Sequence, residues 1–432
     1  MLTLYPKRQL ALPKTHMPHR DGPQPHAAAP RHPIQDTHPT HTEVPSAMPS
    51  RSPILLPFFC LLALACLIWG CDRSNGQVRQ ANAADPPPAQ KPAQAPALKD
   101  APPTAALPAD VQRGICLAHN YQHGGRKGYG SQESMSSKKE LVALGTNWVS
   151  LTPFGWQRSL KSREMSFNPN IGPGESDARM EAETKQAREL GLKIMLKPHI
   201  WINYSEWRGH IDPEGEDGWD VWFASYTKFI LHYARMAQRL KHEALVIGLE
   251  LASASPHRDH WLKLIEEVRK VYDGKIIYAA NWNETHLVAF WDKVDWIGVQ
   301  FFNPLSDSLN PTYDELSKAL HKHLDTYEPL AKKYNKPVIL TEFGYKSIKA
   351  TTASPGTWPE HLSADAKAYD EVNQALAYKA LLNAVGKRTF VKGVYVWKWF
   401  TDVHTDEEGR IGFSPWKKAA SEELKKAYGL RP

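Results

Sequence analysis

The sequence is short of cysteine and of several motifs that mark common enzyme classes. Only four of its 432 residues are cysteine, and a single one, Cys116, lies beyond residue 71. An internal disulfide is therefore excluded for most of the chain, which needs a large core of its own, and we expect Cys116 to be a buried strand residue. A glycine-rich phosphate loop and a serine nucleophile elbow are also missing.

The sequence has no basic stripe and no metal-binding pattern. The formal net charge is +7, and Lys and Arg are interleaved with Asp and Glu, so we expect no nucleic-acid partner. His199 stands alone, and His321 and His323 lie in a charged, helical stretch. We therefore expect no metal site and no cofactor.

The first quarter of the chain differs in composition from the rest. It holds 20 of the 34 prolines up to residue 108, whereas 14 of the 15 tryptophans follow residue 147. Residues 1–47 lack hydrophobic periodicity, and we expect them to be disordered or to precede the true start at Met48. The Pro- and Ala-rich residues 72–111 predict a linker, and residues 112–432 are long enough for one large domain.

Residues 48–71 have the order of an export signal. A short cationic stretch after Met48 precedes an apolar run and a small residue before Cys71. Residues 67–71 resemble a bacterial lipobox, in which the cysteine becomes lipidated; the alternative is an uncleaved signal anchor. Both interpretations predict an exported, membrane-anchored protein, and lipidation would make it a periplasmic or cell-surface lipoprotein.

Short apolar runs alternate with amphipathic segments through the C-terminal three quarters. Near-continuous apolar runs are typical of parallel strands buried on both faces. Strands are predicted at residues 114–118, 148–152, 193–198, 245–251, 275–280, 296–300, 338–341 and 393–397, and helices at 177–190, 219–240, 257–272, 313–334 and 365–385. Eight such units predict an α/β fold, the (β/α)8 TIM barrel. A doubly wound sheet is the competing arrangement.

Polar and aromatic residues follow most of these strands. In such barrels the active site lies at the carboxyl ends of the strands. Aromatic rings there can cover the apolar faces of sugars, while amides and imidazoles can bond hydroxyl groups. The candidates, in strand order, are His119, Asn120, Tyr121, His199, Trp201, Asn203, Glu250, Asn281, Trp282, Asn283, Glu284, Gln300, Asn303, Glu342, Tyr345, Trp397, Lys398 and Trp399.

Two carboxylates stand out. Glu250 and Glu342 each end an apolar strand, where an ionised group is costly unless it is paired or used. Glycoside hydrolysis needs two carboxyl groups across the scissile bond, although each glutamate could also be a salt-bridged strand end. We expect Glu284 to be a rim or surface residue. We also expect Trp397 and Trp399 to point the same way, one of them beneath a sugar.

Several segments together resemble glycoside hydrolase family 113, the barrel β-mannanases of clan A. They are Leu144–Trp148, Lys197–Trp201, the Trp222, Tyr226 and Tyr233-Ala234 pattern, Gly248–Leu251 and Thr341–Gly344. The resemblance spans nearly all of residues 113–416. It implies a retaining enzyme with Glu250 as acid/base and Glu342 as nucleophile. It also implies His199, Trp201, Asn281, Trp282 and Trp397 as sugar-binding residues.

Two positions depart from the clan pattern. Leu249 stands where many clan members have an asparagine before the acid/base, and Phe302 stands where a tyrosine commonly bonds the nucleophile. The expected activity is that of an endo-β-1,4-mannanase acting on a polysaccharide or oligosaccharide. The alternatives are a hydrolase of another β-linked glycan, such as a glucan or exopolysaccharide, and a membrane-tethered polysaccharide-binding protein with weak catalysis.

Overall fold

The computed structural model describes residues 96–119, 126–170, 175–203, 206–404 and 408–429. All of these belong to the compact unit Pro87–Pro432. The predicted disordered segment, the export signal with Cys71, and the candidates Asn120 and Tyr121 lie outside the described residues. Among the helices that are described, none is long and apolar enough to cross a membrane.

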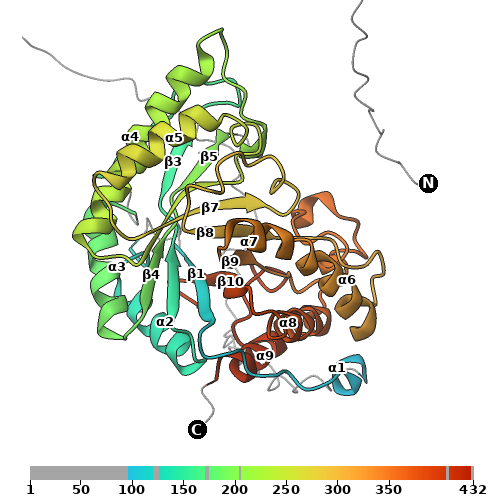
Figure 1. The fold of residues 1–432 in the computed structure, drawn as a ribbon. Helices are drawn as coiled ribbons and strands as arrows, with labels where there is room; N and C mark the ends of the chain where they lie inside the picture. Colours follow the sequence, from blue (N-terminus) through green and yellow to red (C-terminus); the bar gives the residue numbers. More distant parts are fainter. Residues whose placement is uncertain (1–95, 120–125, 171–174, 204–205, 405–407, 430–432) are drawn as a thin grey trace, which may run out of the picture. The chain divides into compact units, whose positions relative to one another are not determined.

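Eight parallel strands close into a barrel, as the alternation of the sequence predicts (Figure 1). Around the barrel they run in the order β1-β10-β9-β8-β7-β6-β4-β2. Their bounds are β1 Gln112–Ala118, β2 Trp148–Leu151, β4 Lys193–Leu196, β6 Ala244–Leu249, β7 Lys275–Asn281, β8 Trp296–Phe301, β9 Val338–Phe343 and β10 Val391–Phe400. The (β/α)8 barrel is thus confirmed, and the doubly wound sheet is excluded.

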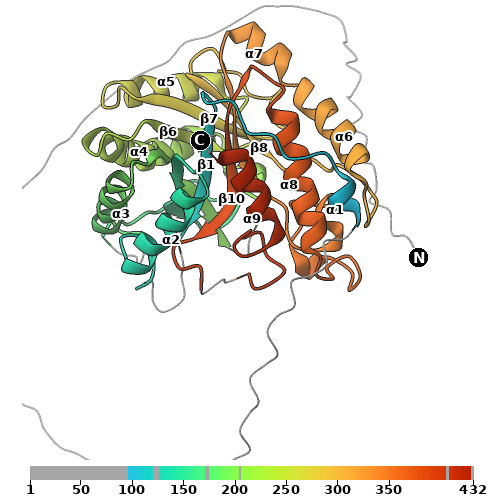
Figure 2. The same cartoon turned by 90° about the horizontal axis from the view of Figure 1, so that it is seen from below.

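Helices surround the strands (Figure 2). Among the described residues they are α1 Pro96–Asp100, α2 Gln132–Ala143, α3 Asp177–Glu189, α4 Gly218–Arg239, α5 Arg258–Arg269, α6 Tyr313–Asp325, α7 Glu328–Tyr334, α8 Glu371–Val385 and α9 Ala419–Tyr428. Short 3₁₀ turns lie at Arg208–His210, Lys349–Thr351 and Pro359–His361. Residues 96–111, assigned to the linker from composition, pack on this layer. Leu98, Leu107 and Val111 are buried there, and the Leu107 amide donates to Ala427 in α9.

Two predicted helices differ from the structure. The predicted helix 313–334 is two helices, because Pro329 in a continuous helix would lack an amide donor and its ring would clash with the carbonyl of Asp325. The predicted helix 365–385 begins only at Glu371. Its N-cap, Asp370, accepts a hydrogen bond from the amide of Asn373, which fixes the start there.

The barrel interior is packed rather than hollow. Seven of the eight barrel strands contribute buried residues to one cluster, which includes Cys116, Trp148, Met195, Val246, Ile277, Ile339 and Tyr395. The partly buried Trp296 of β8 and Trp397 of β10 pack against it. Cys116 is fully buried, as predicted, and burial raises the pKa of its thiol to about 12. Because side chains fill the barrel interior, a ligand can reach it only at the carboxyl ends of the strands.

Bulges change the direction of side chains near those ends. The register shifts by one residue in β6 between Val246 and Gly248, and in β9 between Leu340 and Glu342. A third shift, in β10, separates Trp397 from Trp399. Trp397 joins the interior cluster, whereas Trp399 is buried on the outer side and donates to Ser137 of α2. The expectation that the two rings point the same way was therefore wrong, because a bulge interrupts strand alternation.

A two-stranded parallel sheet stands beyond the barrel strands. It consists of β3 Phe154–Gln157 and β5 His199–Ile202, each a short continuation after β2 and β4 (Figure 1). Neither strand was predicted, since the predicted strands ended at residues 152 and 198. The two strands extend from buried residues such as His199 to the exposed Trp156 and Trp201.

Candidate active site

Glu342 lies in β9 on the interior side of the barrel mouth and is only 4% exposed. Its Oε1 accepts a hydrogen bond from Nζ of Lys197, which follows β4 and is fully buried. The same ammonium also donates to the Thr341 carbonyl at 3.3 Å. A buried carboxylate is tolerated when a cation and hydrogen bonds compensate its lost hydration, so this site keeps Glu342 in a fixed position as one half of an ion pair.

Glu250 follows β6 and has a left-handed backbone, with a φ of 53°. Few residues other than glycine adopt this conformation, and such strain persists where surrounding contacts enforce it. Its amide donates to Ala279 at 2.9 Å, and its Oε2 accepts from Nη1 of Arg208 at 3.0 Å. Burial raises the pKa of Glu250; Arg208 opposes this shift, and the nearby Glu342 carboxylate adds to it.

His199 and Trp397 lie beside Glu342. The two rings are stacked, with centroids 5.9 Å apart and planes 14° apart. His199 Nε2 is 3.7 Å from Glu342 Oε1, is buried, and has no hydrogen-bond partner among the described residues. Burial and the cations Lys197, Arg208 and Lys398 hold the pKa of His199 well below its usual range. A neutral imidazole with an unpartnered ring nitrogen therefore lies beside the Glu342 carboxylate.

The loop after β7 carries two further predicted residues. Asn281 and Trp282 are half-buried, and Asn281 Nδ2 donates to Asn283 at 3.0 Å. Glu284, expected at the rim or surface, is instead 1% exposed. It accepts hydrogen bonds from the hydroxyl of Tyr278 and from the amide of Asn281, because the loop folds back over it. Burial raises the pKa of Glu284 to about 7.

The remaining candidates have side-chain contacts with residues other than the two glutamates described above. Trp201 is on β5, and its ring packs edge-on against Phe154. Gln300 is buried and accepts a hydrogen bond from the Thr341 hydroxyl. Phe302 contacts the ring of Phe413, with centroids 6.2 Å apart. Burial lowers the pKa of His119 to about 4.

The arrangement brings two carboxyl groups, a neutral imidazole and an indole to one end of a parallel barrel. A comparison with protein families finds that the model of Glycoside Hydrolase Family 113 matches residues 119–413. The chain belongs to glycoside hydrolase family 113. The family resemblance inferred from the motifs is thereby confirmed, and the protein is a glycoside hydrolase.

Solved structures of the same family share its fold over their whole length. A family 113 β-1,4-mannanase solved as a complex is 26% identical, with a TM-score of 0.65, and the match covers 74% of this chain and 99% of that one. The β-mannanase of Alicyclobacillus acidocaldarius, in complex with ManMIm, is 27% identical with a TM-score of 0.64 over 74% and 97% of the two chains. A search of curated protein sequences found no match.

A more distant match shows the barrel alone. The β-glucuronidase of Faecalibacterium prausnitzii is 14% identical, with a TM-score of 0.50 over 74% of this chain and 49% of the other. It shares the barrel fold with this family 113 protein.

Sequence reasoning missed the cations of the site. Lys197 was part of a recognised motif but received no role, and Arg208 was not considered. The signal for Lys197 was present, because a lysine directly after an apolar strand is buried and needs an anionic partner. Arg208 reaches Glu250 from a 3₁₀ turn, 42 residues away in sequence, and no local pattern marks that contact.

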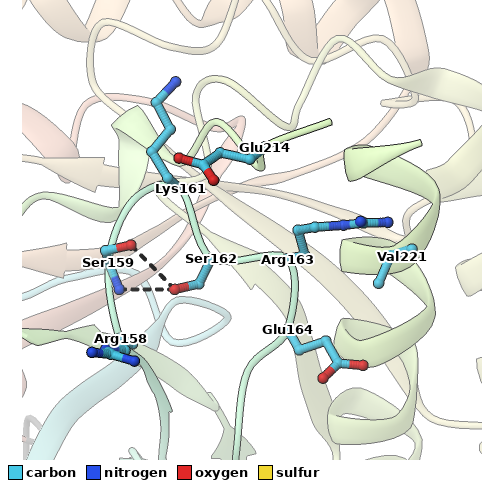
Figure 3. Close-up of a pocket in the computed structure, with 8 residues that line it drawn as sticks. All are labelled: Arg158, Ser159, Lys161, Ser162, Arg163, Glu164, Glu214 and Val221. Atoms are coloured by element: carbon cyan, nitrogen blue, oxygen red, sulfur yellow. Dashed lines mark hydrogen bonds between the residues drawn. The ribbon is translucent and has the colours of Figure 1, made fainter. Parts of the chain in front are cut away.

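A cavity of about 750 Å³ lies next to the end of β3 (Figure 3). It is lined by Arg158, Ser159, Lys161, Ser162, Arg163, Glu164, Glu214 and Val221. Lys161 is paired with Asp212, and Arg163 with Asp217 at 2.7 Å. These pairs neutralise two of its cations, and the serine hydroxyls bond to each other. Neither Glu250 nor Glu342 lines this cavity, so it is separate from the candidate reaction centre.

Proposed function

We propose that this family 113 protein is a retaining endo-β-1,4-mannanase with Glu342 as nucleophile and Glu250 as general acid and base. The observation that carries the assignment is the unequal surroundings of the two carboxyl groups. Glu342 is paired with a buried ammonium, Nζ of Lys197, which holds its carboxyl group in one position. Glu250 is in a site that raises its pKa, which favours the protonated form.

These surroundings suit the two steps of a double displacement. Glu250 protonates the glycosidic oxygen as the bond to the anomeric carbon breaks, and Glu342 attacks that carbon to form a glycosyl-enzyme. Glu250, now ionised, takes a proton from water, which attacks the same carbon and releases Glu342. Lys197 keeps its hydrogen bond to Glu342 throughout and so orients the attacking oxygen.

The residues around Glu342 supply the sugar contacts. The unpartnered Nε2 of His199 is available for a hydroxyl group of the sugar that Glu342 attacks. The Trp397 ring, held flat against His199, offers an apolar face to the same sugar. We propose Asn281, Trp282 and Trp201 for neighbouring sugars. A β-mannoside is the proposed substrate because two family 113 proteins that share this fold are named as β-mannanases.

Phe302 does not argue for loss of catalysis in this site. It cannot donate a hydrogen bond to the nucleophile, but Lys197 already does so. The glycan-binding protein without chemistry is therefore less well supported than the hydrolase.

The test is release of reducing ends from a glycan panel that includes linear β-1,4-mannan, with Glu342→Gln assayed alongside. The proposal expects release from mannan that the substitution abolishes. Release from a different β-glycan would keep the mechanism and replace the substrate. Binding of mannan without release by the parent protein would overturn the hydrolytic proposal and make Phe302→Tyr the next variant.

We further propose that a lipid on Cys71 tethers the enzyme to a membrane after export. The sequence order before Cys71 supports this, and the test is fractionation of cells producing the full chain. Cys71→Ser should move the activity from the membrane to the soluble fraction, while the matched change Cys66→Ser should not. Equal membrane retention of both variants would instead support an uncleaved signal anchor.

A further inference from the structure

The small sheet beyond the barrel carries an aromatic face. Phe154 pairs with His199 in the register of β3 and β5, and Trp156 pairs with Trp201. Paired residues of adjacent parallel strands lie on the same side, and positions two apart share that side. Phe154, Trp156, His199 and Trp201 thus form one face, which we call the aromatic ribbon.

The ribbon is buried at one end and exposed at the other. His199 is 2% exposed beside Glu342, Phe154 is half-buried, and Trp156 and Trp201 are 43% and 36% exposed. The other exposed large hydrophobic side chains among the described residues, Val142, Leu287 and Trp358, lie on separate segments. Trp156 and Trp201 are paired across the sheet, so the two exposed indoles form one patch rather than scattered single exposures.

Ring contacts connect the exposed end to the reaction centre without a break. Trp397 stacks on His199, and the His199 and Phe154 centroids are 5.1 Å apart. Phe154 then contacts Trp156 at 6.3 Å and Trp201 at 6.2 Å. A ligand that extends from the sugar at Glu342 can therefore remain on aromatic rings as far as the surface.

The opposite face fixes the ribbon on α4. Gly155 has room for no side chain, since a Cβ there would lie 2.9 Å from the ring of Phe229. Gln157 Oε1 accepts a hydrogen bond from Trp222 Nε1 at 2.9 Å. The free edge of β3 pairs with Ser166 through two backbone hydrogen bonds. The exposed rings are therefore held in place before a ligand arrives, which lowers the entropic cost of binding.

We propose that the aromatic ribbon binds further sugars of the same β-linked polysaccharide chain that occupies the reaction centre. This rests on the proposed function and extends it, because it makes a polymer the preferred substrate. None of the four ribbon side chains carries a fixed charge, and flat apolar faces suit the faces of neutral pyranose rings better than a charged ligand. Trp156, which the motifs did not single out, is assigned here as a sugar-binding residue together with Trp201.

The test compares Trp156→Ala with the parent on linear β-1,4-mannan and on mannotriose. The quantity of interest is the ratio of kcat/KM on mannan to kcat/KM on mannotriose, and we expect it to fall about tenfold, equivalent to about 1.4 kcal/mol. Trp201→Ala should lower the same ratio, and Trp156→Phe should restore most of it. Tyr334→Ala serves as the control, because this half-buried ring precedes β9 at the opposite end of the barrel. A ratio that stays within twofold of the parent in Trp156→Ala would overturn the proposal.

A binding measurement separates this inference from the mechanism. The variant Glu342→Gln, with or without Trp156→Ala, is run on a native gel that contains mannan. In the Glu342→Gln background, we expect Trp156→Ala to abolish the retardation by mannan and Tyr334→Ala to leave it unchanged. Equal mobility of Glu342→Gln and the two double variants would overturn the proposal that the aromatic ribbon binds sugars. A parent protein that is retarded but cleaves no glycan would remove the proposed hydrolysis alone. Matched thermal unfolding midpoints are required to exclude a folding defect.

Discussion

Two carboxyl groups lie at the barrel mouth in different surroundings, Glu250 after β6 and Glu342 in β9. We call these two places the β6 side and the β9 side. On the β9 side, Glu342 is inside the barrel and is held by the ammonium of Lys197. On the β6 side, Glu250 is on a strained backbone, with Arg208 at one oxygen and with burial raising its pKa. Both glutamates follow a bulge in their strands. The comparison teaches that position along a strand places a carboxyl group, while contacts from other segments give it its cationic partner.

The largest expected effect is on the β9 side. Glu342→Gln should lower kcat on mannan by roughly 10⁴-fold or more, because no nucleophile remains to form the glycosyl-enzyme. Initial-rate assays measure this loss, with Glu266→Gln on the exposed face of α5 as the matched control. A variant that keeps a tenth of the parent rate would remove Glu342 from the mechanism.

The β6 side should respond differently to the leaving group. Glu250→Ala should lose about 10²- to 10⁴-fold on mannan, because general acid catalysis contributes about that much. With a 2,4-dinitrophenyl β-mannoside, whose leaving group needs no proton, formation of the glycosyl-enzyme should fall far less. Burst kinetics with this substrate measure that step. Equal losses on both substrates would contradict the general-acid role.

Removal of the cation on the β9 side should destabilise the fold. Lys197→Met leaves Glu342 buried without its partner, and breaking a buried ion pair in this way costs about 3–5 kcal/mol of unfolding free energy. Urea denaturation measures the change. The double variant Lys197→Met/Glu342→Gln should recover part of the loss, and failure to recover any would show that packing of Lys197, rather than its charge, matters.

A smaller effect, on the pH dependence of stability, is expected from Glu284, which lies in the loop after β7. Its pKa in the folded protein is about 7, above its ordinary value of 4.5, so the protonated form is favoured by folding. The stability that this provides is complete below pH 4.5 and is lost as the pH rises through 7, a change of up to about 3 kcal/mol. Glu284→Gln should lack this part of the pH dependence. Urea denaturation at pH 4.5 and pH 8 measures it, and parallel losses in parent and variant would contradict the assignment.

The barrel and the positions of the two glutamates were predictable from sequence because they depend on local patterns. Apolar runs mark strands that are buried on both faces, and a carboxylate at the end of such a run is easily seen. All eight barrel strands lie within a few residues of their predicted bounds. Glu250 and Glu342 lie at the same end of the barrel because all of its strands are parallel and their carboxyl ends lie at one end.

The features that were missed depend on register and on distant contacts. A one-residue bulge in β10 separates the directions of Trp397 and Trp399, and nothing in the sequence marks its position. Glu284 is buried only because Tyr278 and the Asn281 amide turn toward it. The exposure of Trp156 depends on a two-stranded sheet that the apolar runs of the sequence did not predict. Each is set by tertiary packing rather than by periodicity.

The most direct test of the account is to trap the glycosyl-enzyme. The enzyme is incubated with a 2-deoxy-2-fluoro-β-mannosyl fluoride, whose fluorine slows hydrolysis of the intermediate, and its peptides are analysed by mass spectrometry. We predict one added fluorosugar on the peptide that contains Glu342, and none on the peptide that contains Glu250. A sugar attached to Glu250 or to any other residue would contradict the assignment. Continued turnover of mannan without inactivation by the reagent would contradict the covalent mechanism itself.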